Sequence, residues 1–335
     1  MVAVKLRDGR QLGYADWGNS GASAVFYFHG AVGSPMRRCA ATDEALAALG
    51  IRYVLAHRPG FGLSDPQPGR TLGSWADDVA ELADALDIER FAVLGVSAGA
   101  PYAAACAHRL GGRVTATGFV SGLTPEGVTF PLRVLRRAPR AGRAVLGTAV
   151  HGVRAQPRLL VAGLNARNGR ADAAALADPE ARAVFLESFL AATDRGVRPM
   201  IEDFLLAAGP WGFAPADVRQ PVELWHGVGD TTVPVAHARA LADALPDCRA
   251  TFAEREGHFF FRSRMTEILG ALVSRRLTGL APHEPERRAA AGQRDRLAHD
   301  EAMTRVEGDV RLLGGLEVAR EAVAVGQRQA RPEQR

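Results

Sequence analysis

The stretch GVSAGA, residues 95–100, contains a serine with a glycine two positions away on each side. Ser97 directly follows an apolar run, FAVLGV, and directly precedes SAGAPYAAACAHRL, a segment with helical composition. A serine in this strand–turn–helix context can serve as an exposed nucleophile, and the sharp turn needs small neighbours such as Gly95 and Gly99. The alternative is a serine that only caps the helix. The rest of the chain has to decide between the two.

Segments of strand type and helix type alternate around this serine. Apolar or alternating runs predict eight strands: VAVKLR, RQLGYADWG, AVFYFHG, IRYVLAHRPG, FAVLGV, VTATGFVSG, VELWHGV and RATFAERE. Helical patterns lie at 42–49, 74–88, 97–110, 236–245 and 265–277. Strands of the buried type alternating with helices predict an α/β fold with a mostly parallel sheet and helices on both faces.

The alternation is interrupted once, which predicts the domain organisation. Residues 123–219 contain several helical patterns and no convincing strand, so we expect a helical insertion in a core made of residues 1–122 and 220–280. Residues 281–335 have no aromatic side chain and balance ten arginines with ten acidic residues. We expect this extension to be loosely packed or disordered, with some helix.

Composition excludes several classes of protein. The 335 residues are 47% hydrophobic and 23% charged, and no apolar run approaches the ~18 residues of a membrane span. The net charge of +4 comes from a chain with one lysine, Lys5, and an excess of arginine, alanine and glycine. This bias is typical of a GC-rich bacterial genome, so we expect no nucleic-acid binding. The amino end lacks a secretory signal, and three cysteines favour reduced thiols, which together predict a cytoplasmic protein.

Serine needs a base, and the base needs a group that orients it. His258 in GHFFF follows the last strand, and Asp230 in HGVGDTTVP follows the strand before it. Each has a simpler interpretation, a loop histidine and a turn aspartate. The order Ser97, Asp230, His258 is nevertheless the chain order of a serine hydrolase triad of the α/β type. We therefore predict these three as the catalytic residues.

Acyl transfer also requires backbone N–H groups that face the developing oxyanion. Ala98, directly after the serine, is expected to supply one. The glycine-rich segment HGAVGS after the strand AVFYFHG is expected to supply the other from Ala31, because Gly30 lets its backbone approach a ligand closely. We assign His29 a structural role in supporting this loop.

Taken together, the segments HGAVGS, RPGFGLSD, GVSAGA, HGVGDTTVP and GHFFF resemble the alpha/beta-hydrolase superfamily over residues 29–260. The resemblance implies an eight-stranded, mostly parallel sheet with a helical cap at residues 123–219, and neither a cofactor nor a metal. Two positions depart from the family pattern. His57 stands where aspartate is frequent, and Ala100 stands where a second glycine is frequent.

The predicted activity is hydrolysis of a small ester or lactone through an acyl-enzyme. Other activities of the same fold remain open: aminopeptidase, carbon–carbon bond hydrolase and cofactor-free perhydrolase. A non-catalytic, receptor-like binder is the alternative from another class. We expect no stable membrane insertion, and the sequence does not predict the oligomeric state.

The insertion bears on the substrate. Between Leu123 and Arg170 there are nine arginines and one acidic residue, which fits either a solvated helix face or a surface for an acidic or amphiphilic substrate. Phe204, Trp211 and Phe213 are candidates for lining the substrate pocket, and equally for plain core.

Overall fold

Eight strands form one sheet in the computed structural model, which describes residues 1–31, 33, 38–124 and 139–278. The strands are β1 (Val2–Lys5), β2 (Gln11–Trp17), β3 (Ala24–Phe28), β4 (Arg52–Ala56), β5 (Phe91–Val96), β6 (Val114–Val120), β7 (Val222–Gly227) and β8 (Cys248–Ala253). Their order in the sheet is β1-β2-β4-β3-β5-β6-β7-β8. β2 pairs antiparallel with β1 and β4, and all other pairs are parallel. The predicted mostly parallel sheet of eight strands is confirmed.

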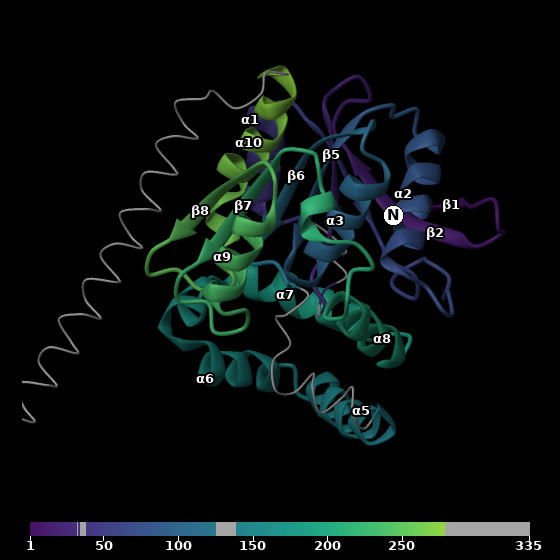
Figure 1. Cartoon of the computed structure of the whole chain (residues 1–335). Coiled ribbons are helices and arrows are strands. Elements are labelled where there is room, and N and C mark those ends of the chain that lie inside the picture. The colour runs from purple at the N-terminus through teal and green to yellow at the C-terminus, as the bar shows by residue number, and fades with distance from the viewer. Residues whose placement is uncertain (32, 34–37, 125–138, 279–335) are drawn as a thin grey trace, which may run out of the picture. The chain divides into compact units, whose positions relative to one another are not determined.

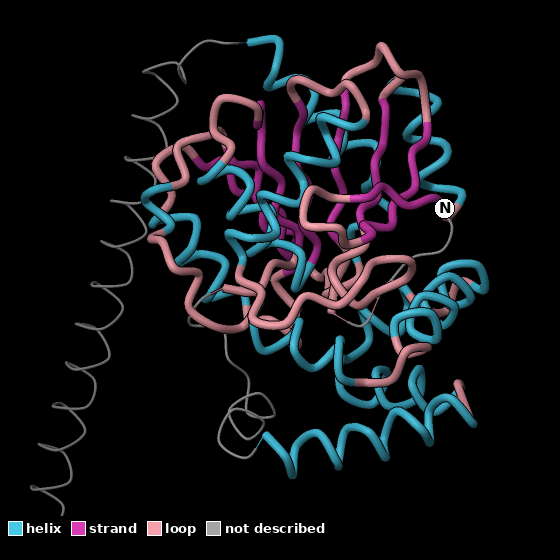
Figure 2. Tube along the Cα trace, turned by 90° about the vertical axis from the view of Figure 1, so that its right-hand side faces the viewer, coloured by secondary structure: helices cyan, strands magenta, loops and turns pink. Residues whose placement is uncertain are grey.

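Five helices of the core cover the two faces of the sheet (Figures 1 and 2). They are α1 (Ala40–Leu49), α2 (Leu72–Ala85), α3 (Ala100–Arg109), α9 (Val235–Ala244) and α10 (Met265–Thr278). Successive strand residues point to opposite faces. In β5, Phe91 and Val93 accordingly belong to the hydrophobic cluster with α2, α3 and α9, whereas Ala92 and Leu94 belong to the cluster with α1 and α10. This two-sided burial explains why the central strands read as continuous apolar runs.

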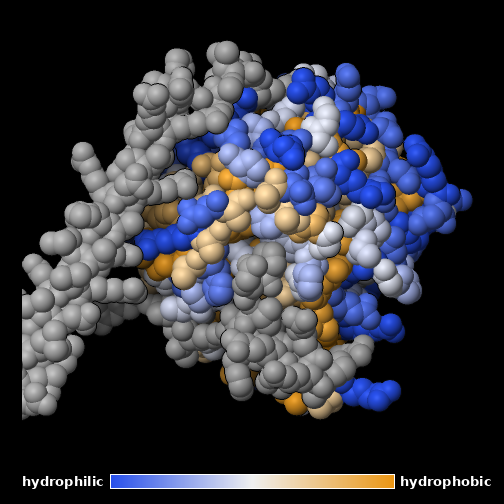
Figure 3. All heavy atoms as spheres, viewed as in Figure 1, coloured by the Kyte–Doolittle hydropathy of each residue, from blue (hydrophilic) through white to orange (hydrophobic). Residues whose placement is uncertain are grey.

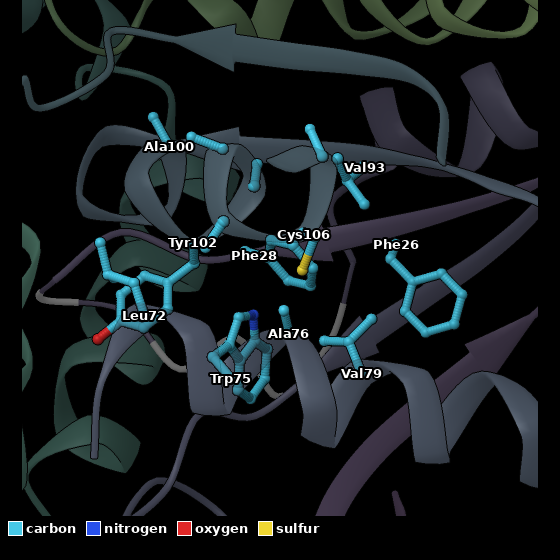
Figure 4. Close-up of a cluster of buried hydrophobic side chains, with 14 of the residues drawn as sticks. Phe26, Phe28, Leu72, Trp75, Ala76, Val79, Val93, Ala100, Tyr102 and Cys106 are labelled. Carbon is cyan, nitrogen blue, oxygen red and sulfur yellow. The ribbon is translucent and has the colours of Figure 1, made fainter. Parts of the chain in front are cut away.

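The helix that follows Ser97 is held by one of these clusters (Figure 4). The indole of Trp75 on α2 meets Phe28 of β3 edge-on at 5.3 Å between ring centroids and Tyr102 of α3 at 5.9 Å. All three side chains are almost completely buried. Burial of a large apolar side chain is worth about 1.5–3 kcal/mol. The packing therefore fixes α3, and with it the turn at Ser97, against the sheet.

Helix α2 shows how the local sequence sets an element boundary. It begins at Leu72, two residues before the predicted start, because Thr71 caps it: Thr71 Oγ1 accepts from the Ser74 N–H, and Ser74 Oγ accepts from the Thr71 N–H, each at 3.0 Å. Its inner side is buried, and Figure 3 shows mainly hydrophilic side chains on the outer surface over α2 and the β1–β2 hairpin. The helix is amphipathic, as its sequence pattern predicts.

Four helices among the described residues lie between β6 and β7 in the chain and are called the inserted helices below. They are α5 (Pro139–Ala155), α6 (Arg158–Ala175), α7 (Pro179–Ala192) and α8 (Arg198–Ala207). The Asp178 carboxylate caps α7 by accepting from the Ala181 N–H at 2.8 Å, and Pro179 occupies the first turn, where its missing N–H costs nothing. Figure 1 shows the inserted helices together at one end of the sheet. Residues 125–138 of the predicted insertion lie outside the described residues.

The described residues belong to one unit, Met1–Gly279. The predicted extension, 281–335, lies outside them. Within the described part of the chain, no helix combines the length and apolar character that crossing a bilayer requires.

Candidate active site

Ser97 lies at a strained turn between β5 and α3. It opens the short 3-10 helix η1 (Ser97–Gly99), and its φ of 54° lies in the left-handed region that non-glycine residues rarely adopt. Such strain persists where the surroundings enforce it, most often at functional sites. A Cβ on Gly95 would overlap the backbone of Gly99, and a Cβ on Gly99 would overlap the carbonyl of Phe28. Glycine is thus required on both sides of the serine.

Ala100 stands where a second glycine is frequent in the family, and a glycine opposite it makes room for its methyl group. Ala100 is fully buried, and a Cβ added to Gly122 would lie 2.6 Å from the Ala100 methyl. The methyl that replaces the frequent second glycine is therefore accommodated because residue 122 has no side chain.

The glycine-rich segment after β3 lies beside Ser97. A Cβ on Gly30 would be 3.5 Å from Ser97 Cβ and 4.0 Å from Ser97 Oγ. Ala31 and Ala98, the residues predicted to supply oxyanion donors, are both buried in this region. A Cβ at Gly30 would thus be in van der Waals contact with the serine side chain, so the backbone of residue 30 borders the hydroxyl.

Asp230 and His258 are brought together by the loops that follow β7 and β8. His258 Nδ1 lies 2.7 Å from Asp230 Oδ2, so that Nδ1–H donates to the carboxylate. The two loops approach so closely that a Cβ on Gly227 would overlap the Gly257 carbonyl. They are also joined by a hydrogen bond from Gly229 N–H to Glu256 O at 2.8 Å.

The other oxygen of Asp230 is also occupied. Oδ1 accepts from the backbone N–H groups of Thr232 and Val233 at 2.8 and 2.9 Å. Asp230 therefore does both things that the sequence allowed: its Oδ1 stabilises the turn, and its Oδ2 accepts from the histidine. The turn fixes the direction in which the carboxylate points.

The electrostatics of the pair favour an ion-pair-like hydrogen bond. Burial alone would raise the pKa of Asp230, but the charge and hydrogen bond of His258 outweigh it and keep this pKa below its usual value. Burial likewise disfavours protonation of His258, but the nearby Asp230 carboxylate raises the pKa of the imidazole above 6.5. The arrangement stabilises an imidazolium, which is the form a general base reaches after accepting a proton.

The segment after β6 joins the serine turn to the histidine loop. Leu123 N–H donates to Ser97 O at 3.0 Å, and Ser121 Oγ donates to His258 O, also at 3.0 Å. Ser121 is fully buried and has a φ of 47°. Three residues of chain thus connect the two backbones that carry the hydroxyl and the imidazole.

Comparisons with known proteins agree with this architecture. Residues 23–141 match a family model described as alpha/beta hydrolase fold. Among solved structures, an esterase from Exiguobacterium antarcticum superposes with a TM-score of 0.61 at 18% identity, covering 81% of this chain and 98% of that one. An esterase from a Rhodococcus species superposes with a TM-score of 0.61 at 23% identity, covering 83% and 98%.

The chain is an alpha/beta-hydrolase-fold protein. The resemblance seen in the sequence is thereby confirmed at the level of the fold.

Curated relatives match this alpha/beta-hydrolase-fold chain only in part. A pimeloyl-[acyl-carrier protein] methyl ester esterase from Aromatoleum aromaticum is 49% identical over 59 residues, which is 18% of this chain and 24% of the relative. A non-heme chloroperoxidase from Streptomyces lividans is 34% identical over 129 residues, 37% of this chain and 46% of the relative. The chain thus spans less than half the length of these relatives.

A buried cation supports the segment beside Ser97, and sequence reasoning missed it. Arg58, in RPGFGLSD, is fully buried; it donates to His29 O at 2.5 Å and to Gly30 O at 3.2 Å. Its other donors meet Asp203 of helix α8, which also accepts from Tyr102 Oη–H at 2.7 Å. Arg58 thus links the inserted helix α8 to the backbone of His29 and Gly30, next to the serine.

The two histidines near this cation are neutral. Burial, followed by the positive charge of Arg58, lowers the pKa of His29 well below 6.5, and the same causes lower the pKa of His57 to about 4. His29 Nδ1–H donates to Gly30 O at 2.8 Å, in keeping with the supporting role assigned to it. His57 packs against Gly62, where a Cβ would lie 2.7 Å from its Nδ1. The histidine at position 57 therefore acts as an uncharged packing residue.

Asp172 is a second functional candidate absent from the sequence analysis. It lies on α6, is 1% exposed, and accepts from the Phe259 N–H through Oδ1 at 3.0 Å. Asp172 lies in no motif, and Arg58 opens the motif RPGFGLSD without any sign of its partners, because Asp203 and Phe259 lie 145 and 87 residues away from them in the chain.

The three predicted pocket residues lie against the core. Trp211 is 4% exposed and contacts Phe119 of β6 edge-on at 6.5 Å, and Phe213 stacks on His108, near the far end of α3, at 4.5 Å. Phe204 on α8 is partly buried against the same cluster. These contacts favour the core alternative for Trp211 and Phe213.

A metal centre has no support in the part of the chain that the structure describes. No group of three or more histidine, cysteine, aspartate or glutamate side chains in those ranges could hold a metal ion.

Proposed function

We propose that this chain is a serine hydrolase that cleaves a small ester or lactone through an acyl-enzyme. One observation supports this most strongly: the imidazole of His258 bonds to the carboxylate of Asp230 at 2.7 Å, at the same edge of the sheet as a serine held in a strained turn. Ligands of open α/β sheets bind at the carboxyl ends of the strands, where all three residues lie.

In the proposed mechanism His258 accepts the proton of Ser97 as the hydroxyl attacks the carbonyl carbon. Asp230 holds the imidazole with Nε2 as the base and stabilises the cation. The N–H groups of Ala31 and Ala98 stabilise the oxyanion; that of Ala98 has no partner inside η1, since the first N–H groups of a helix are unsatisfied within it. The leaving alcohol takes the proton from His258, and a water activated by the same histidine then releases the acid.

The comparisons support an ester as substrate. One partial relative is named for methyl ester hydrolysis, and the two reported structural neighbours are esterases. The experiment is a screen of p-nitrophenyl esters and lactones with the wild type and with Ser97→Ala. Ser263→Ala, on η3 (Phe260–Arg264), serves as the matched serine control. Turnover abolished only by Ser97→Ala supports the proposal; a well-folded wild type without turnover on any ester supports the receptor-like alternative.

Perhydrolysis is a second candidate, favoured by the partial match to a chloroperoxidase. Hydrogen peroxide would replace water in the second step: its oxygen attacks the acyl-enzyme, a peracid leaves, and Ser97 regains its proton. Peracid formed from acetate and hydrogen peroxide, and lost in Ser97→Ala, would support it. Ester turnover without peracid would restrict the activity to hydrolysis.

The inserted helices are proposed to act as a cap over the site. Support comes from Asp203 and Asp172, since each bonds to a loop that borders the triad, and from α8, which contacts η1. A cytoplasmic location is proposed from the three cysteines, which are free. The arginine-rich part of the insertion is only partly described; there Arg154 donates to Leu190 O at 2.9 Å, a structural use.

A further inference from the structure

A carboxylate from the inserted helix α6 meets the loop that carries His258. Asp172 Oδ1 accepts from the Phe259 N–H at 3.0 Å, and the side chain is 1% exposed. A Cβ on Gly257, the residue before His258, would overlap the same carboxylate. The loop therefore has room for Asp172 only because residue 257 is glycine.

Hydrophobic contacts around this carboxylate fix it to the loop. The ring of Phe259 meets Phe185 of α7 edge-on at 5.4 Å. Leu176, at the end of α6, is buried in the same cluster as Phe259. Two inserted helices thus pack on the residue that follows His258, which keeps Asp172 in place.

Only one of the two oxygens of the Asp172 carboxylate has a hydrogen-bond partner among the described residues. Oδ2 is buried and has no hydrogen-bond partner among them. Burial raises the pKa of Asp172, and the Phe259 N–H and the charge of His258 counteract it. A buried carboxylate with an unpaired oxygen is costly, and such sites are usually explained by function.

Two carboxylates, those of Asp230 and Asp172, act on the His258 imidazole within the described ranges, and a second histidine lies beside the first of them. Asp230 bonds to the imidazole; His226 of β7 lies 3.4 Å from the same Asp230 oxygen and is kept neutral mainly by burial; Asp172 approaches from α6. Charged residues of the next turn have other contacts: Arg264 pairs with Glu267, and Arg262 lies over the Phe261 ring.

We propose that Asp172 is a positioning residue through which the inserted helix α6 holds the His258 loop and adds a second negative charge beside the imidazole. The inference rests on the proposed function, since it assigns His258 the role of base. Its consequence is that the basicity of His258 depends on the inserted helices being seated on the loop.

The test separates charge from hydrogen bonding. Asp172→Asn keeps an oxygen for the Phe259 N–H and removes the charge, whereas Asp172→Ala removes both. Without the charge, protonated His258 is less stable. We therefore expect the acidic limb of the kcat/KM profile of Asp172→Asn to move to lower pH by about half a pH unit or more. Asp178→Asn is the matched control, because Asp178 caps the neighbouring helix α7 and bonds within the insertion.

A second readout does not depend on turnover. The downfield proton NMR signal of the hydrogen bond between His258 and Asp230, assigned by its loss in Asp230→Asn, should titrate at lower pH in Asp172→Asn than in the wild type. The same shift in both measurements, absent in Asp178→Asn, supports the proposal. An unchanged titration in folded Asp172→Asn overturns it, even if Asp172→Ala fails to fold. A wild type that lacks turnover but shows the NMR shift contradicts the proposed function and leaves the electrostatic contact established.

Discussion

Arg58 and Asp203 form a bidentate ion pair in which neither side chain is exposed to solvent. Arg58 Nε lies 2.8 Å from Asp203 Oδ1, and Nη2 lies 2.7 Å from Oδ2. The residues are 145 positions apart and belong to the core and to an inserted helix. Because Arg58 also bonds to the carbonyl oxygens of His29 and Gly30, the pair couples the insertion to the loop beside Ser97.

Asp203→Ala should be strongly destabilising. It leaves the Arg58 guanidinium buried without its counter-charge, which typically costs about 3–5 kcal/mol. The measurement is urea unfolding followed by circular dichroism. Arg109→Ala is the control, since it breaks an exposed ion pair with Asp77 worth about 1 kcal/mol or less. Equal losses of unfolding free energy in the two variants would contradict the expectation that the buried Arg58 pair contributes more than an exposed one.

Gly99→Ala should impair both stability and activity. The added methyl overlaps the carbonyl of Phe28, the last residue of β3 before the glycine-rich segment, and overpacking of backbone costs about 1–3 kcal/mol or more. A displacement of about 1 Å near the reacting atoms can reduce kcat about 10²-fold. Gly112→Ala is the control, because nothing lies within 4 Å of a Cβ there. Wild-type kinetics in Gly99→Ala would contradict the tight turn.

The sequence predicts the strands well because burial on both faces leaves a plain signal. All eight strands are found, although the predicted runs for β3, β4 and β8 extend a few residues past the observed ends. Those extra residues are the loops that bear the site, such as His29 after β3. They are included in the predicted runs because HG after β3, HRPG after β4 and ERE after β8 directly continue those strands without a clear break in the sequence, whereas the backbone leaves the sheet there.

The site is only half visible in the sequence, for a physical reason. Ser97, Asp230 and His258 stand out because each follows a strand within a recognisable motif. Arg58 and Asp172 act through contacts between distant segments, and no local spacing encodes such contacts. A buried charge is unusual unless paired, but burial itself is not readable from one sequence.

Ser121→Ala should weaken catalysis with a moderate loss of stability. It leaves the buried His258 carbonyl without its donor, which costs about 1–3 kcal/mol and should loosen the loop that bears the proposed base, His258. Ester turnover and thermal unfolding are the measurements. Ser263→Ala removes a similar hydroxyl-to-carbonyl bond, to Phe260 in the same loop, but a less buried one. A larger loss of kcat in Ser263→Ala than in Ser121→Ala would contradict the role of the β6 segment.

The pH dependence should reflect His258. Only neutral His258 can accept the serine proton, and its pKa is raised, so kcat/KM should fall on acidification with a midpoint above 6.5. For stability the sign is opposite: the favourable charge on His258 is fully present below pH 6.5 and is lost as pH rises through the folded-state pKa. Asp230→Asn should lower the midpoint. His151→Gln, exposed on α5, should leave it unchanged; a midpoint unmoved in Asp230→Asn would contradict the pairing.

The central claim is that Ser97 is an activated nucleophile. It is tested most directly by treating the folded protein with a fluorophosphonate and mapping the adduct by peptide mass spectrometry. The account predicts one adduct per chain, on Ser97, formed rapidly in the wild type and much more slowly in Asp230→Asn. Stoichiometric labelling of a different serine, or no labelling of folded protein at neutral pH, would contradict it.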